Sequence, residues 1–306
     1  MPGRADPRAA ARRVELARGD EQRGARAHGL LLVFATAEAL ETEARLCPAL
    51  ADLGVRCEPL SREELARREP ALRDDLAGGA WFPDDAHLRP EKLVAALARL
   101  VRERGGVIEE RCEVHGFERE AARVVAARTS RGPRSCAAVV LATGAWSPEL
   151  GRALGLPLLV EPGRGYSITF ERPDACPRIP LILEEAAVGV TPWRSGLRLS
   201  GTMEFSGFDR RPRPARLAAL RAGARRFLRS SEGAQTVEEW FGWRAMTPDE
   251  LPIIGRAQRL ANVYVATGHG RMGVSMAPAT AKLVAELLTG AEPHVDPRPY
   301  APERFA

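Results

Sequence analysis

A glycine-rich turn in the C-terminal part of the chain is the first feature whose residue types could do chemistry. Gly268, Gly270 and Gly273 satisfy the spacing G-x-G-x-x-G. They follow an expected strand, NVYVAT, and open an expected helix over residues 274–288, the context of a dinucleotide-binding βαβ unit. A second parallel strand should follow, but the next segment, VDPRPY with Asp296, cannot be a central strand. We therefore reject an ordinary nicotinamide-binding module.

The turn could still bind an anionic group even though the chain is not a nicotinamide-binding module. A glycine turn at a helix N-terminus presents unpaired N–H groups and the positive end of the helix dipole, about half a charge. Such a site can hold a phosphate, or it can face the pyrimidine edge of a flavin, where negative charge accumulates on reduction. The alternative is a tight turn that serves only strand–helix packing.

The segments that must position this turn alternate between expected helices and strands at both ends of the chain, which predicts an α/β arrangement. A capping-box pattern, Ser61 with Glu64, starts a helix that Pro70 ends, and Pro90 starts an amphipathic helix that runs to about Arg104. The remaining expectations before residue 158 are helix over 9–26, strand over 28–36, helix over 37–54, strand over 107–120, and a strand over 137–142 buried on both faces.

Residues 158–242 have a different pattern of apolar and polar residues. Short alternating strands, GYSITF, AAVGVTP, LRLSGTMEF and VEEWFGW, are divided by Pro and Gly and predict a mostly antiparallel sheet interrupted by one helix over 214–228. The fold class expected is mixed α/β, with two discontinuous domains: residues 1–80 mainly in a substrate domain, 81–157 in a cofactor domain, 158–240 in the substrate domain and 241–306 in the cofactor domain.

Composition excludes several classes of protein. The 306 residues carry a net charge of +5, but only Lys92 and Lys282 are lysines, and the arginines are interleaved with acidic residues. No basic stripe with aromatic residues appears, so nucleic acid is not an expected partner. The five cysteines, Cys47, Cys57, Cys112, Cys136 and Cys176, lack CxxC spacing, which predicts reduced thiols and no metal site. We expect a cytoplasmic location, with peripheral contact at the inner face of the membrane left open.

Five strings together resemble the FAD-dependent amino-acid oxidoreductases of the D-amino-acid oxidase, glycine oxidase and D-amino-acid dehydrogenase superfamily. They are VVLATGAWSPEL, EPGRGYSITF, LRLSGTMEFSGFD, WFGWRAMTPDELPIIG and NVYVATGHGRMGVSMAPATAKLVAELLTG. Their order and spacing match the family, and the resemblance runs from about residue 10 to the end. It implies an FAD-binding Rossmann-like domain with an antiparallel substrate domain.

The resemblance also implies site residues. Arg244, in the W-x-G-W-R string, corresponds to the arginine that grips the substrate carboxylate, a task suited to its planar fork, and Tyr166 could line the substrate pocket or be a core residue. The residues implied to contact the cofactor are Val114, Thr143, Gly144, Trp146, Gly268, His269, Gly270, Arg271, Met272, Gly273 and Val274. The implied reaction is hydride transfer from an amino or imino acid, a D-amino acid or a D-hydroxyproline-like compound, to FAD, with oxygen or a quinone as the final acceptor.

The chain departs from the family pattern at its start. Family members begin with a strand, a G-x-G-x-x-G turn and a helix, and nothing ahead of His28 matches that unit. We therefore expect an incomplete central sheet in this chain alone, and poor or no binding of FAD. A second hypothesis follows, that the chain is a truncated, non-catalytic remnant that binds an amino acid or a partner chain.

Overall fold

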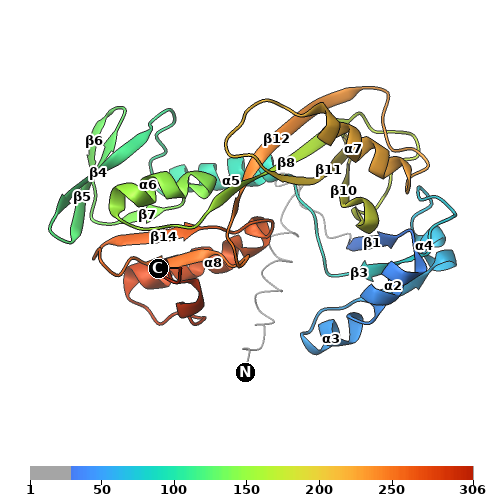
Figure 1. Cartoon of the computed structure of the whole chain (residues 1–306), viewed down its shortest axis with the longest axis horizontal. Coiled ribbons are helices and arrows are strands. Elements are labelled where there is room, and N and C mark those ends of the chain that lie inside the picture. The colour runs from blue at the N-terminus through green and yellow to red at the C-terminus, as the bar shows by residue number, and fades with distance from the viewer. Residues whose placement is uncertain (1–28, 306) are drawn as a thin grey trace. The chain divides into compact units, whose positions relative to one another are not determined.

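The computed structural model describes residues 29–305 (Figure 1). The helix expected over residues 9–26 lies outside this range. The chain divides into two compact units: unit 1 comprises residues 1–108, 165–202 and 211–241, and unit 2 comprises residues 109–164, 203–210 and 242–306. The expected boundaries lie after residues 80, 157 and 240, whereas the units change after residues 108, 164, 202, 210 and 241. The helix that starts at Pro90 thus belongs to unit 1, and residues 203–210 belong to unit 2.

Unit 1 is built on an eight-stranded sheet with the order β12-β8-β11-β10-β9-β1-β3-β2. The strands are β1 (Leu30–Phe34), β2 (Glu58–Ser61), β3 (Gly78–Phe82), β8 (Glu161–Phe170), β9 (Leu181–Leu183), β10 (Val188–Trp193), β11 (Gly196–Phe205) and β12 (Thr236–Met246). β9, β10 and β11 pair antiparallel, as do β1, β2 and β3, whereas β1 and β9 are parallel. The antiparallel sheet predicted for residues 158–242 is confirmed, and the first strands of the chain extend it.

The helices in the described part of unit 1 begin either after a capping side chain or at a proline in their first turn. They are α2 (Ala37–Ala44), α3 (Cys47–Asp52), α4 (Arg62–Arg68), α5 (Pro90–Glu103) and α7 (Pro214–Arg225), with a short 3-10 turn, η2 (Glu184–Ala186). Both hydrogen bonds of the predicted capping box at α4 are present: Ser61 Oγ accepts from Glu64 N, and the Glu64 carboxylate accepts from Ser61 N. The single helix expected over residues 37–54 is two helices, because Pro48 starts a new one at α3.

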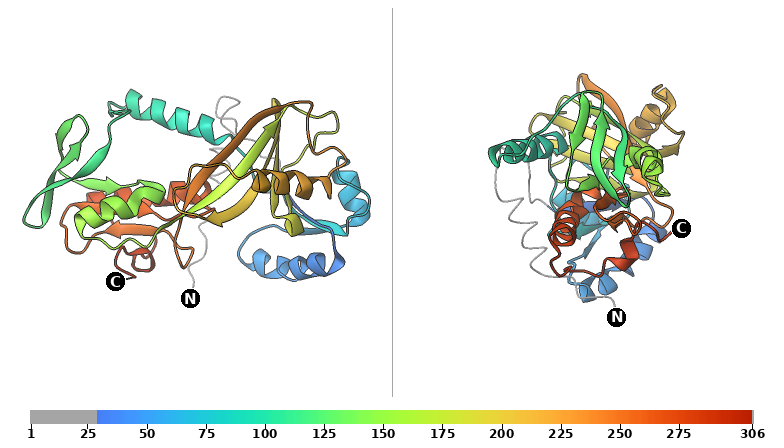
Figure 2. Two further views of the ribbon diagram at one scale, coloured as in Figure 1. Left: turned by 45° about the horizontal axis from the view of Figure 1, so that its top comes forward. Right: turned by 90° about the vertical axis from the view of Figure 1, so that its left-hand side faces the viewer.

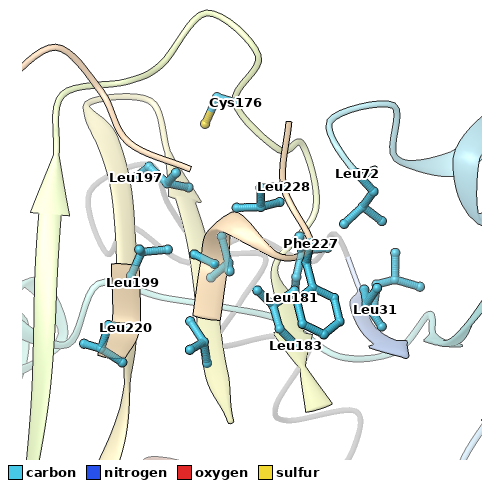
Figure 3. Close-up of a cluster of buried hydrophobic side chains, with 14 of the residues drawn as sticks. Leu31, Leu72, Cys176, Leu181, Leu183, Leu197, Leu199, Leu220, Phe227 and Leu228 are labelled. Carbon is cyan, nitrogen blue, oxygen red and sulfur yellow. The ribbon is translucent and has the colours of Figure 1, made fainter. Parts of the chain in front are cut away.

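The core of unit 1 lies between the sheet and α7 (Figure 3). Alternate residues of the strands supply it, among them Leu181 and Leu183 from β9 and Leu197 and Leu199 from β11, all at most 1% exposed. Each such side chain contributes about 2 kcal/mol when it is removed from water. The period-2 pattern of these strands therefore fixes which face is buried.

Unit 2 holds two three-stranded sheets, β13-β14-β7 and β4-β5-β6. Its elements are β4 (Val114–Glu120), β5 (Arg123–Thr129), β6 (Gly132–Ser135), β7 (Val139–Leu141), η1 (Gly144–Trp146), α6 (Ser147–Leu154), β13 (Ile253–Arg256), β14 (Val263–Thr267), α8 (Gly273–Thr289) and η3 (Arg298–Tyr300). The β4–β6 sheet is a separate twisted ribbon (Figure 2), and α8 packs against β13 and β14. A second core, with Leu154 and Val263 among its members, fills this unit.

Two strand predictions in unit 2 are corrected. Residues 107–113 are not a strand, since β4 begins only at Val114. The strand over 137–142 shortens to Val139–Leu141 and is not buried on both faces: Val140 is 38% exposed, and within residues 29–305 β14 is its one sheet partner. A strand paired along one edge leaves its other edge of N–H and C=O groups outside the sheet.

The expectation that all cysteines are reduced is wrong for one pair. Cys47, at the start of α3, and Cys57, just ahead of β2, form a disulfide across ten residues of sequence. Cys112, Cys136 and Cys176 are free thiols.

Three strands change unit partway along their length. β8 passes from unit 2 to unit 1 after Arg164, β11 passes from unit 1 to unit 2 after Thr202, and β12 does the same after Phe241. The described part of the chain has no helix long and apolar enough to cross a membrane.

Candidate functional site

The site is organised by a parallel pair of strands in unit 2. β7 and β14 run side by side in the register Val139↔Val263 to Leu141↔Val265. The same tripeptide, Ala-Thr-Gly, follows at the same level on both strands, at residues 142–144 and 266–268. Ligands of open α/β sheets bind outside the carboxyl ends of parallel strands. The two Ala-Thr-Gly turns therefore mark the edge of the sheet where a ligand is expected.

Hydroxyl groups bind the two turns together. Ser147 Oγ donates to Thr267 Oγ1 at 2.8 Å, Thr267 Oγ1 donates to Gly144 O at 3.0 Å, and Thr143 Oγ1 lies 3.1 Å from Ser147 Oγ. Ser147 and Thr267 are both buried. Consecutive hydrogen bonds that are shielded from water reinforce one another. The two turns are therefore held together as one rigid edge of the sheet.

The glycines of the second turn are required by its backbone. Gly268 and Gly270 have φ angles of 76° and 52°, a region that residues with a Cβ rarely adopt. A Cβ at Gly268 would also lie 2.6 Å from Thr247 Cγ2. Gly270 N donates to Ala245 O at 2.8 Å, which ties the turn to the end of β12.

Helix α8 starts from this turn without a side-chain cap. Met272 precedes the helix and accepts no hydrogen bond from it through its side chain, and the first turn contains no acidic residue. The amide groups of the first turn of α8 are thus available to a ligand, with the positive end of the helix dipole behind them.

His269 links the turn to the body of α8. Its Nε2 lies 2.9 Å from Thr280 Oγ1, and burial lowers the pKa of the imidazole from its ordinary value. The ring is therefore neutral at neutral pH and has a structural partner, which fits a turn residue better than a general base.

Arg244 has one guanidinium nitrogen that is buried without a hydrogen-bond partner. Its Nη1 atom is buried and has no hydrogen-bond partner within the described part of the chain. Burial lowers the pKa of the guanidinium, and the nearby charge of Arg271 lowers it further. A buried N–H donor of a charged group that lacks an acceptor is costly, so this position favours an anionic ligand.

A cavity of about 560 Å³ adjoins the glycine turn. Its lining includes both alanines of the Ala-Thr-Gly turns, Ala142 and Ala266, together with His269, Gly273 and small residues along α8. Volumes of 300–1,000 Å³ are typical of cofactor and ligand sites. Free amide donors, a glycine turn and an apolar wall of small residues fit the edge of a flat, electron-accepting ring, so the residues present suit a flavin.

The other expected cofactor residues are spread around this edge. Trp146 follows Gly144, stacks on Phe208 with ring centroids 5.1 Å apart, and meets Trp243 edge-on at 5.7 Å. Arg271 forms a long ion pair with Glu250 at 3.9 Å. Met272 and Val274 flank the start of α8 and are exposed.

Two predicted residues belong to sheets other than the one that carries the glycine turn. Val114 begins β4 in the separate three-stranded sheet, where it pairs with Thr129. Tyr166 lies on the unit 1 part of β8 and is 2% exposed within the apolar core, with its ring 6.1 Å from Phe241. The structure thus gives Tyr166 the surroundings of a core residue, and its place in a substrate pocket stays a prediction.

A buried ion pair underlies the loop that carries Phe208. Arg164 Nε donates to Glu204 Oε1 at 2.8 Å, Nη2 contacts the same oxygen, and Nη1 donates to Asp209 O. Ser206 Oγ also donates to Glu204 Oε1, at 2.9 Å. The pair fixes both ends of the loop over residues 206–209.

Sequence reasoning missed the residues that hold the site together. Ser147, Thr267, Arg164 and Glu204 were not predicted as site residues. The repeated Ala-Thr-Gly was a usable signal for Thr267, because two apolar strands that end alike suggest paired turns. No cluster of three or more metal-ligating side chains occurs among residues 29–305.

Comparisons with known proteins give one consistent result. The family described as FAD dependent oxidoreductase matches residues 7–287. Glycine oxidase of Pseudomonas putida is 39% identical over 237 residues, which are 76% of this chain and 64% of that protein. D-amino acid dehydrogenase of Granulibacter bethesdensis is 31% identical over 92% of this chain and 68% of that protein. This chain thus spans about two thirds of the length of these relatives.

Solved structures agree with the sequence relatives. Glycine oxidase from Geobacillus kaustophilus superposes with a TM-score of 0.90 at 27% identity, covering 99% of this chain and 84% of that one. L-proline dehydrogenase from P. horikoshii superposes with a TM-score of 0.85 at 25% identity. The mixed α/β fold with its large antiparallel sheet is therefore the fold of these enzymes, as predicted.

Proposed function

Because this chain belongs to the family of FAD-dependent oxidoreductases, we propose that it takes part in the oxidative deamination of an amino or imino acid. The observation that carries the proposal is the buried Nη1 atom of Arg244, which has no hydrogen-bond partner in the described residues. An α-amino acid supplies the carboxylate that this group needs. We expect the substrate to be a D-amino acid or a D-hydroxyproline-like imino acid.

Each part of the site has a task in this proposal. Arg244 binds the carboxylate by two parallel hydrogen bonds and orients the α-carbon. FAD, when bound, supplies the acceptor for the hydride that leaves this carbon. The first amide groups of α8 stabilise negative charge at the edge of the sheet, and Gly268 and Gly270 give the turn the shape that presents these groups. The Ser147–Thr267 hydrogen bond keeps both turns in register.

His269, the histidine of the glycine turn, is not assigned the role of a general base in this proposal. His269 is held by Thr280, and its pKa is lowered. A substrate that enters with a neutral amine needs orientation and a place for negative charge rather than a proton relay. The final electron acceptor in this proposal is dioxygen, or a quinone reached by peripheral contact with the inner face of a membrane.

The first test asks whether the purified chain binds FAD. After incubation with FAD and gel filtration, flavin absorbance that co-elutes with the protein would support the proposal and would overturn the expectation of poor FAD binding drawn from the start of the sequence. Anaerobic addition of D-proline, D-alanine or glycine should then bleach the flavin bands. A protein that stays colourless would contradict the proposal and favour a non-catalytic role, the second hypothesis drawn from the sequence.

The second test isolates the carboxylate site. Arg244→Leu should weaken binding of a simple carboxylate such as benzoate by about 10- to 100-fold, since a hydrogen bond to a charged group is worth about 1.5–3 kcal/mol. Arg256→Leu is the matched control, because Arg256 is exposed on β13 of the same unit. Calorimetry measures both variants, and equal affinity for the two would refute the role of Arg244.

A further inference from the structure

Arg244 lies between two residues that are tied to other segments of unit 2. On one side, the indole Nε1 of Trp243 donates to Gly207 O at 3.1 Å. On the other side, Ala245 O accepts from Gly270 N at 2.8 Å. The stretch of β12 that carries the arginine is therefore fixed at both of its neighbours, once by the loop that follows β11 and once by the glycine turn.

The tie through Trp243 matters because β12 is the end strand of its sheet. In the order β12-β8-β11, β8 borders β12 on one side, and among residues 29–305 no strand pairs with the outer edge of β12. Successive side chains of a strand point to opposite faces. Trp243 thus holds the strand from the face opposite to that of Arg244, and the position of the guanidinium depends on what Trp243 contacts.

Trp243 belongs to a cluster of three aromatic rings. Its ring lies 5.5 Å from that of Phe208 and 5.7 Å from that of Trp146, both edge-on, and Trp146 stacks on Phe208 at 5.1 Å, measured between ring centroids. Edge-on and stacked pairs at these separations are favourable beyond the burial of their surface. Each ring contacts the other two, so the loss of Phe208 removes two of the three contacts and loosens Trp243.

The loop that carries Phe208 is anchored by the buried ion pair of Arg164 and Glu204, which holds both of its ends. Between these anchors Gly207 has a φ angle of 58°, a region that favours glycine. The carbonyl oxygen of Gly207 is the one that accepts from the indole of Trp243. A loop held in this way can fix the residues that it contacts.

We propose that Phe208 and Trp243 are positioning residues for Arg244, so that the loop after β11 sets how tightly the site binds a carboxylate. Neither ring needs to touch the substrate in this role. The inference rests on the proposed function, because it assigns the two residues to the carboxylate site of that reaction. It makes the affinity for the substrate depend on aromatic contacts at the opposite face of β12.

The test measures benzoate binding by calorimetry. Phe208→Leu should weaken binding about 5- to 10-fold, because leucine cannot stack on Trp146 or meet Trp243 edge-on. Phe208→Tyr keeps the ring and should bind benzoate as the natural sequence does. Trp243→Phe should weaken binding about 3-fold, because it loses the N–H that donates to Gly207 O. Phe205→Leu is the matched control, since Phe205 is a 61% exposed ring at the end of β11.

A double-mutant cycle separates positioning from a general loss of structure. When Phe208→Leu is added to Arg244→Leu, it should cause no further loss of benzoate affinity, because no guanidinium is left to position. Urea unfolding of each variant verifies that it is folded under the conditions of the calorimetry.

Three outcomes are decisive. If Phe208→Leu binds benzoate as tightly as Phe205→Leu does, the inference is overturned and the proposed function stands. An equal loss with and without Arg244 also overturns it, because the effect then does not pass through the guanidinium. If the natural sequence binds no benzoate, or if Arg244→Leu binds it equally well, the proposed function fails at its carboxylate site and this inference fails with it.

Discussion

Breaking the Arg164–Glu204 ion pair should destabilise unit 2 strongly. The Arg164 side chain is 0% exposed and that of Glu204 is 6% exposed. Glu204→Leu removes the carboxylate that accepts from Nε and Nη2 and leaves a guanidinium in a site without water. Removing one partner of a buried pair costs about 3–5 kcal/mol. With a urea m-value of about 3 kcal/mol/M, the midpoint should fall by about 1–1.7 M.

The assay is urea unfolding followed by tryptophan fluorescence. Trp146 and Trp243 lie in the affected unit, next to the loop that the ion pair fixes. The double variant Arg164→Met/Glu204→Leu is the control, because it removes both charges and fills similar volume. Replacing a whole buried pair by apolar residues is often neutral, so the double variant should recover most of the loss.

Two outcomes would refute this reasoning. If Glu204→Leu unfolds at the same urea concentration as the natural sequence, the pair is not buried as the structure has it. If the double variant is as unstable as Glu204→Leu, the loss comes from contacts of Glu204 other than the charge of Arg164.

Two further predictions concern unit 2. Asn262→Leu should cost about 3 kcal/mol, because its amide makes two buried hydrogen bonds, with Val124 N and Val124 O, and a partly buried one to Ala137 O. The exposed Gln258→Leu is the control in urea unfolding, and an equal loss in both would contradict the prediction. The pKa of Glu286 is lowered from 4.5 to about 2, chiefly by Lys282 and next by His294, so the stability that this carboxylate contributes is present above pH 4.5 and is lost as the pH falls toward 2. Glu286→Gln should therefore lose less stability than the natural sequence between pH 4.5 and 2, and an NMR titration midpoint of Glu286 near 4.5 would contradict the assignment.

Local signals in the sequence were the reliable ones. The capping box of Ser61 and Glu64 and the helix start at Pro90 depend on neighbouring residues, and both appear as predicted. The glycine turn at 268–273 was also found from its own residues, because its positive φ angles need glycine.

Features that depend on distant segments were predicted poorly. The apolar run at residues 137–142 looked buried on both faces, but the extent of a strand depends on its sheet partners, and β7 has β14 alone among the described residues. The pairing of Cys47 with Cys57 depends on the fold of a loop and not on spacing rules. The Arg164–Glu204 pair joins residues 40 positions apart in a chain with many arginines, so no local pattern could single it out.

The role of Arg244 came from resemblance rather than from local physics. One arginine among many is most often a surface residue, and only its place in W-x-G-W-R suggested otherwise. The structure adds an independent reason, because a buried Nη1 without a partner needs an anion.

The three strands that change unit partway along their length have a consequence for how such a protein can arise. Genes that exchange whole domains recombine at flexible linkers, where a cut leaves both products folded. A cut between Arg164 and Gly165, or between Phe241 and Gly242, falls inside β8 or β12 instead. It would leave two incomplete strands, whose backbone N–H and C=O groups no longer pair in register with the neighbouring strands. The two units are therefore expected to be inherited together, and to vary through loops rather than by trading one unit for another.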